Sequence, residues 1–130
     1  MNNITIVVPC YNEENNIQNF YDNVKTILDK LNKEYNVTYK FLFVDDGSSD
    51  NTPNLLKQLN KEHSESVDII ILSRNFGKEA ALYAGFANSQ SEYTAVMDAD
   101  LQDPPELLVE MYLGIVNEGY DCVAARRKNR

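Results

Sequence analysis

The sequence predicts an α/β domain in which helices cover both faces of a mainly parallel sheet. Three observations support this fold class. Short apolar segments rich in β-branched residues recur along the 130 residues, they alternate with segments of helical periodicity, and polar loops follow them. Parallel strands need a long crossover between them, usually a helix. Alternating strands and helices therefore imply a parallel sheet that is buried on both faces.

Five apolar segments are predicted to be strands. Valine, isoleucine and aromatic residues dominate them, which is typical of strands that pack in the interior of a sheet. The expected strands cover residues 4–8, 40–44, 67–72, 93–97 and 121–125.

Helices are predicted between these strands. Apolar residues recur three and four positions apart over residues 17–31, so they share one helical face. Thr52 followed by Pro53 is predicted to be the N-cap and first position of the second helix. A third, alanine-rich helix is expected at residues 79–87, and a fourth after Pro104.

Composition restricts the classes of function. The chain is long enough for one domain, residues 1–130, and its net charge of -8 disfavours nucleic-acid binding. Cys10 and Cys122 lie far apart without zinc-site spacing, so we expect free thiols in a reducing compartment. No signal peptide and no membrane-spanning apolar run is recognised in the 130 residues.

Polar loops follow four of the predicted strands. Ligands of open parallel sheets bind beyond the carboxyl ends of the strands, so these loops are expected to share one edge and form a binding site. The loops cover residues 9–14, 45–50, 73–78 and 98–103.

The strongest metal-ligand candidates are Asp98 and Asp100, which follow the fourth strand. In an extended chain residues i and i+2 point to the same side, so two carboxylates would gather there and favour a divalent cation. Oxygen ligands suit Mg²⁺ or Mn²⁺. The alternative is a solvated acidic turn in which Asp103 caps the next helix.

The loop after the second strand has a simpler structural interpretation, because Asp, Gly and Ser are common turn and capping residues. Of Asp45 and Asp46, one could accept a hydrogen bond from a base or ribose. No G-x-G-x-x-G motif and no P-loop is present. Tyr11 could stack on a base. The candidate phosphate partners, each of which could instead be a solvated surface charge, are Arg74, Lys78, Arg126, Arg127, Lys128 and Arg130.

Four motifs together resemble glycosyltransferase family two. They are VVPCYNEE (residues 7–14), VDDGSSDNT (44–52), SRNFGKEAALYAG (73–85) and MDADLQDPPE (97–106). The segments NFGK and LQDP are most similar to the branch that contains dolichyl-phosphate mannose synthases and bactoprenol glucosyltransferases.

The resemblance implies a Rossmann-like GT-A fold and inverting transfer of a sugar from a nucleoside diphosphate-sugar, with UDP or GDP as the nucleotide, to a polyprenyl phosphate. It implies that a bound Mg²⁺ or Mn²⁺ is held by Asp98, Asp100 and Gln102. It further implies that the nucleotide-sugar is surrounded by Pro9, Tyr11, Glu13, Val44, Asp46, Asp98, Ala99 and Arg127.

Family members continue past the position of Arg130 with an acceptor half, so the resemblance implies that this chain is the donor-binding part of a longer protein. The catalytic base and the contact with the membrane, at its cytoplasmic face, are expected in that later part. Homo-oligomerisation is left open. Two other classes use similar acids: receiver-like signalling modules and phosphatases built on Asp-x-Asp. Receiver modules carry their acid pair after the first strand, whereas Asp45 and Asp46 follow the second. The phosphatase motif usually follows the first strand as well, whereas Asp98 and Asp100 follow the fourth.

Overall fold

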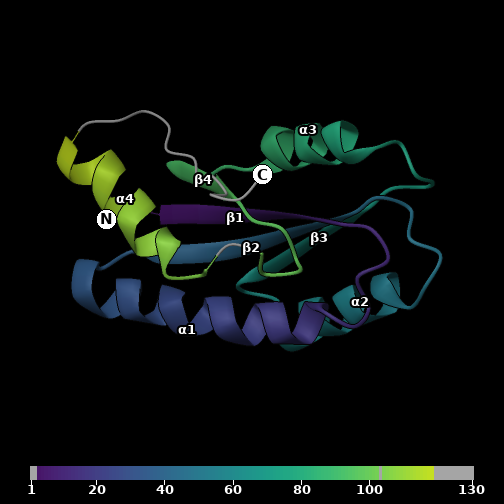
Figure 1. Cartoon of the computed structure of the whole chain (residues 1–130), viewed down its shortest axis with the longest axis horizontal. Coiled ribbons are helices and arrows are strands. Elements are labelled where there is room, and N and C mark those ends of the chain that lie inside the picture. Colours follow the sequence, from purple (N-terminus) through teal and green to yellow (C-terminus); the bar gives the residue numbers. More distant parts are fainter. Residues whose placement is uncertain (1–2, 103, 119–130) are drawn as a thin grey trace.

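The computed structural model describes residues 3–102 and 104–118, with no side-chain description for 115–118. Strands and helices alternate along this part of the chain, as the sequence predicts (Figure 1). The elements are β1 (Asn3–Cys10), α1 (Ile17–Tyr35), β2 (Thr38–Asp45), α2 (Thr52–Glu62), β3 (Val67–Ile71), α3 (Lys78–Asn88), β4 (Tyr93–Val96) and α4 (Leu107–Glu118).

The four described strands form one parallel sheet in the order β3-β2-β1-β4. Helix α3 covers one face, and α1, α2 and α4 contribute to the core on the other (Figure 1). The predicted parallel sheet with helices on both faces is therefore confirmed. Because the chain moves from β1 outward to β3 and then returns to the far side of β1, the strand order reverses between β1 and β4. Ligands of open α/β sheets bind at such a reversal.

Two apolar cores hold the helices against the sheet. The larger one lies under α1 and α2, where Phe20 meets Phe41 and Phe43 edge to face at 6.3 and 6.0 Å between ring centroids. The smaller one lies under α3. Gly85 allows this helix to come close, because a Cβ atom there would lie 2.4 Å from Cγ1 of Val7. Gly85 thus lets the second half of α3 lie close against β1.

Pro9 lies in β1 just beyond the point where β1 and β4 separate. Pairing of β1 with β2 continues to Cys10, whereas pairing with β4 ends at Val7. The carbonyl of Val7 accepts a bond from the Met97 amide on the β4 side at 3.1 Å. Pro9, two residues on, faces the same side. Its missing N–H costs no ladder bond there, because β4 has already ended.

The start of α2 differs from the prediction. Thr52 is the first helical residue and Asn51 the N-cap, which makes no side-chain capping bond. The Thr52 hydroxyl instead accepts a bond from the Glu13 amide at 2.9 Å and donates to Asp50 at 2.6 Å. A long-range partner in another loop therefore overrides the local capping preference.

The predicted strand at residues 121–125 lies outside the described residues. Within the part of the chain that the structure describes, no helix is long and apolar enough to cross a membrane.

Candidate functional site

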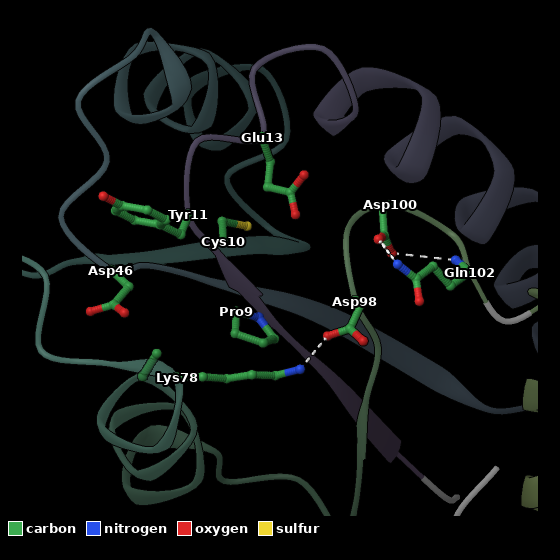
Figure 2. Close-up of a pocket in the computed structure, with 10 residues that line it drawn as sticks. Pro9, Cys10, Tyr11, Glu13, Asp46, Lys78, Asp98, Asp100 and Gln102 are labelled. Atoms are coloured by element: carbon green, nitrogen blue, oxygen red, sulfur yellow. Dashed lines mark hydrogen bonds and ion pairs between the residues drawn. The ribbon is translucent and has the colours of Figure 1, made fainter. Parts of the chain in front are cut away.

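A cavity of about 310 Å³ lies at the carboxyl edge of the sheet, where β1 and β4 separate (Figure 2). Residues from all four polar loops converge there, as expected when parallel strands end at one edge. Figure 2 shows Tyr11 and Asp46 on one side of the cavity and Asp100 and Gln102 on the other. Its lining consists of Pro9, Cys10, Tyr11, Glu13, Asp46, Lys78, Ala81, Asp98, Asp100 and Gln102.

Most of the site residues named from the sequence line this cavity. They come from segments far apart in the chain, and the strand ends bring them together. The residues that were predicted and that line the cavity are Pro9, Tyr11, Glu13, Asp46, Asp98, Asp100 and Gln102.

Two predicted nucleotide contacts do not reach the cavity through their side chains. Val44 is fully buried in the small core beneath α3, because its side chain points to the face that this helix covers. Ala99 is 1% exposed and packs in the large core between the two acids that flank it. Val44 and Ala99 could therefore meet a nucleotide only through their backbone atoms, and their assignment stays a prediction. The prediction for Arg127 falls outside the described residues.

The loop that carries Tyr11 and Glu13 is fastened to the loop after β2. Asn12, at φ 54°, accepts a bond from the Ser49 amide at 2.9 Å with its side chain, and its own amide donates to the Ser48 hydroxyl at 2.8 Å. Cross-loop bonds of this kind rigidify irregular backbone. Half-exposed Tyr11 is therefore presented from a braced loop. A turn was predicted for the loop after β2, but its pairing with the Tyr11 loop was not.

Asp46 fastens the loop after β2 to the start of α3. Its buried carboxylate accepts bonds from the amides of Phe76 at 2.8 Å and Gly77 at 3.1 Å, and from the Asn75 side chain at 3.2 Å. A carboxylate at a helix N-terminus also meets the positive end of the helix dipole. Asp46 therefore holds α3 in place as well as lining the cavity.

Two glycines allow this contact between the loops. Gly47 has φ +71°, and a Cβ atom there would lie 2.2 Å from the carbonyl carbon of Arg74. Gly77, the N-cap of α3, has φ +104° and ψ 158°, a combination that is essentially restricted to glycine. The glycines of the DDG and NFGK segments thus both allow the loop after β2 to contact the segment that begins α3.

The acids after β4 lie in a turn and not in extended chain. The Leu101 amide donates to the Asp98 carbonyl at 3.3 Å, and Leu101 has φ 53°. The reasoning from extended geometry was therefore wrong in its premise, although both carboxylates do line the same cavity. Asp98 and Asp100 point to different parts of that cavity, and Asp100 accepts a hydrogen bond from the side-chain amide of Gln102 (Figure 2).

Lys78 reaches into the cavity from the first turn of α3. Its ammonium donates to Oδ1 of Asp98 at 2.9 Å. Lys78 was one of several candidate phosphate partners. It lines the cavity, whereas Arg74, another candidate, does not. The Arg74 guanidinium lies 4.6 Å above the ring of Phe76.

Sequence reasoning did not anticipate that Cys10 lines the cavity. This free thiol is 2% exposed and donates to the Val8 carbonyl at 3.4 Å. Burial raises the pKa of the Cys10 thiol well above its usual value, and the nearby carboxylates of Glu13 and Asp45 add to the effect. A raised pKa favours the neutral thiol, which here forms part of the cavity wall.

The oxygen atoms after β4 suit a magnesium or manganese ion. Mg²⁺ usually takes one or two protein carboxylates and obtains its remaining ligands from phosphate and water. The carboxylates of Asp98 and Asp100 and the amide oxygen of Gln102 are of this chemical type and line one cavity. The described residues contain no cluster of three or more His, Cys, Asp or Glu able to enclose a metal alone. Two carboxylates and one amide oxygen match the number and type of protein ligands that Mg²⁺ commonly takes.

Comparison with known families identifies the class of protein. The family model described as Glycosyl transferase family 2 matches residues 5–130, nearly the whole chain. The chain belongs to glycosyl transferase family 2. The expected family is thereby confirmed, and neither the receiver-like nor the phosphatase interpretation has support.

Two curated relatives share substantial sequence with this family 2 chain. An undecaprenyl-phosphate 4-deoxy-4-formamido-L-arabinose transferase of Proteus mirabilis is 38% identical over 130 residues, covering 100% of this chain. An uncharacterized glycosyltransferase of Synechocystis is 43% identical over 129 residues, covering 98% of this chain. The match spans 38% of the length of each relative.

Solved structures of glycosyltransferases have the same fold as this family 2 chain. The mannosyltransferase PcManGT of Pyrobaculum calidifontis, in complex with GDP-Man and Mn²⁺, superposes with a TM-score of 0.70 at 23% identity over 87% of this chain and 32% of that one. S. aureus TarS residues 1–349, in complex with UDP, gives 0.66 at 17% identity over 96% of this chain and 38% of that one. The GT-A fold is confirmed.

Proposed function

We propose that this chain binds a nucleoside diphosphate-sugar together with Mg²⁺ or Mn²⁺. The whole protein that contains this donor-binding part would transfer the sugar, with inversion, to a polyprenyl phosphate. One observation carries the proposal. The cavity at the strand reversal has an exposed aromatic ring at one end and oxygen ligands for a divalent cation at the other. A nucleoside diphosphate has matching groups, a flat base followed by an oxygen-rich anion.

The nucleoside is assigned to the end formed by Tyr11, Asp46 and Pro9. Tyr11 is 49% exposed, so its ring can gain contact area with a base. The Asp46 carboxylate accepts three hydrogen bonds within the chain and has limited capacity for one more, toward base or ribose. Glu13 lies farther along the same wall, on the loop that Thr52 braces.

The diphosphate and its cation are assigned to the end formed by Asp98, Asp100 and Gln102. When bound, the cation acts as a Lewis acid that stabilises the charge of the leaving diphosphate. Asp98 and Asp100 supply the negative charge that holds it, and the Gln102 amide orients Asp100. Arg127 is the proposed basic partner of the diphosphate on motif grounds.

A lipid phosphate is proposed as the acceptor. The Proteus mirabilis relative is an undecaprenyl-phosphate 4-deoxy-4-formamido-L-arabinose transferase. A phosphate monoester has its second pKa at about 6, so near neutral pH it already carries a charged oxygen that can attack the sugar. It needs less help from a general base than a sugar hydroxyl does. The reaction would occur at the cytoplasmic face of the membrane.

The test is a transfer assay with the whole protein in vesicles that contain undecaprenyl phosphate. A panel of labelled UDP- and GDP-sugars is offered with Mn²⁺, and label in the lipid fraction is measured. We expect one donor to give a labelled lipid phosphate sugar. The Asp100→Asn variant should give none, because it removes a charge that holds the cation while keeping the side-chain shape.

Matched vesicles without the lipid phosphate serve as the control. Label in a soluble glycan, or equal label with and without the lipid, would contradict the proposed acceptor. Failure of all donors to bind in the presence of Mn²⁺ would contradict the proposed donor class.

A further inference from the structure

Lys78 is the only positively charged residue among the described residues that line the cavity. It faces an acidic wall formed by Glu13, Asp46, Asp98 and Asp100. Its ammonium pairs with one of these acids, Asp98, at 2.9 Å. A site with this balance of charge would repel a diphosphate unless a cation were available to meet it. Among the described residues that line the cavity, Lys78 provides that positive charge.

The position of the Lys78 backbone is fixed by the contacts already described. Lys78 is the first residue of α3, and the Asp46 carboxylate holds the amides of the two residues before it. Asp98 belongs to the turn after β4. The ion pair therefore crosses the cavity, and Figure 2 shows the lysine stem spanning it below Pro9. The anchored part is the backbone, and the charged end is the part that can change partner.

The ion pair is of a kind that exchanges easily. The side chains of Lys78 and Asp98 are 61% and 35% exposed. Pairs at such exposure contribute little to stability because water screens them. The Asp98 carboxylate is also one of the oxygen ligands proposed for the divalent cation, so the ammonium and that cation compete for it. A diphosphate arriving with the cation would bring oxygen atoms that the lysine could bind instead.

We propose that Lys78 is an exchanging counter-ion. In the ligand-free chain it neutralises Asp98, and when the donor binds with its cation the ammonium moves from Asp98 to the phosphate oxygens. This inference rests on the proposed function and adds a donor-binding residue to it. The exchange also makes cation and nucleotide binding cooperative. The cation displaces the Lys78 ammonium from Asp98, and the ammonium is then available to bind the phosphate oxygens of the nucleotide.

The test compares Lys78→Met, which keeps the stem and removes the charge, with Lys78→Arg, which restores the charge. Lys40→Met is the matched control, because Lys40 forms a similarly exposed ion pair with Asp68 at 3.1 Å near the amino end of β2. Binding of Mn²⁺ alone is measured by the electron paramagnetic resonance signal of the free ion. Binding of UDP and GDP, with and without Mn²⁺, is measured by calorimetry, and thermal melts check folding.

We expect Lys78→Met to bind Mn²⁺ alone about two- to fivefold more tightly, the range that loss of an exposed competing ion pair allows. The same variant should bind the nucleoside diphosphate with Mn²⁺ about tenfold more weakly, because a charged hydrogen bond to phosphate is lost. Lys78→Arg should restore nucleotide binding, and Lys40→Met should match the wild type in both titrations.

Unchanged or weaker Mn²⁺ binding by Lys78→Met would overturn the competition at Asp98. Unchanged nucleotide binding by that variant, when the wild type binds, would overturn the exchange while leaving the proposed function intact. If the wild-type chain binds neither nucleotide with Mn²⁺, the proposed function fails and the inference fails with it.

Discussion

Replacing Asp46 with alanine tests both its structural and its ligand-binding role. The change removes a buried carboxylate that accepts bonds at 2.8 and 3.1 Å from two backbone amides and at 3.2 Å from the Asn75 side chain. A donor left without its partner costs about 1–3 kcal/mol, and these donors are only partly buried. We therefore expect the free energy of unfolding to fall by about 2–4 kcal/mol. The chain should remain folded, since domains are usually stable by about 5–15 kcal/mol.

The assay for Asp46→Ala combines urea unfolding, followed by circular dichroism, with calorimetry of ligand binding. We expect nucleoside binding to weaken more than binding of free pyrophosphate with Mn²⁺, because Asp46 is assigned to the nucleoside end. Asp45→Ala is the matched control. It also removes a buried acid, but Asp45 accepts bonds only from nearby Ser48 among the side-chain contacts described, and it does not line the cavity.

Unchanged stability of Asp46→Ala would refute the reasoning about loop anchoring. Equal losses for nucleoside and pyrophosphate would show that Asp46 acts through the position of α3 and not on the nucleoside. Loss of nucleoside binding by Asp45→Ala of the same size would show that any disturbance of this loop has the effect.

Five further substitutions test three separate parts of the structure. Asp100→Asn should melt like the wild type but lose most Mn²⁺-dependent nucleotide binding in calorimetry. Asp98→Asn should show a smaller metal effect. If either variant binds the nucleotide with Mn²⁺ as well as the wild type does, the solvated-turn interpretation is favoured. Gly77→Ala should destabilise the chain by about 1–3 kcal/mol through backbone strain alone. Gly47→Ala should cost more in urea unfolding, because its Cβ would lie 2.2 Å from the facing loop backbone; equal losses would contradict the close approach. Burial acts to raise the pKa of Asp50, but hydrogen bonds at the start of α2 outweigh it and lower the pKa. That contribution is present above the unfolded pKa of about 3.9 and is lost as pH falls through the lower folded value. Asp50→Asn should therefore reduce the free energy of unfolding at pH 6 and by less as pH falls below about 4, whereas a constant difference across this range would refute the assignment.

The fold could be predicted from local pattern because each strand and helix carries its own periodicity. The expected strand at residues 40–44 lies within β2, and the helix over residues 17–31 within α1. Strand order could not be read from the sequence, because it depends on which helices pack on which face. The start of α2 was predicted wrongly for a related reason: Thr52 has a partner in a distant loop.

The loops that form the candidate site could be predicted from the sequence, but their conformation and the directions of their side chains could not. Asp98 and Asp100 were correctly expected in one cavity, but through an extended segment that is in fact a turn. Val44 was assigned by motif, and its burial under α3 follows only from packing. The ion pair of Lys78 with Asp98 has no sequence signal, because the two residues meet only once β4 and α3 are placed.

The central claim is that a nucleoside diphosphate and a divalent cation bind together where β1 and β4 separate. Crystals grown with UDP or GDP and Mn²⁺, measured at a wavelength where manganese scatters anomalously, would locate the ion directly. We expect the manganese peak within coordination distance of Asp100 and the diphosphate, with the base beside Tyr11. Nucleotide at the amino edge of the sheet, or manganese away from both Asp98 and Asp100, would contradict the claim.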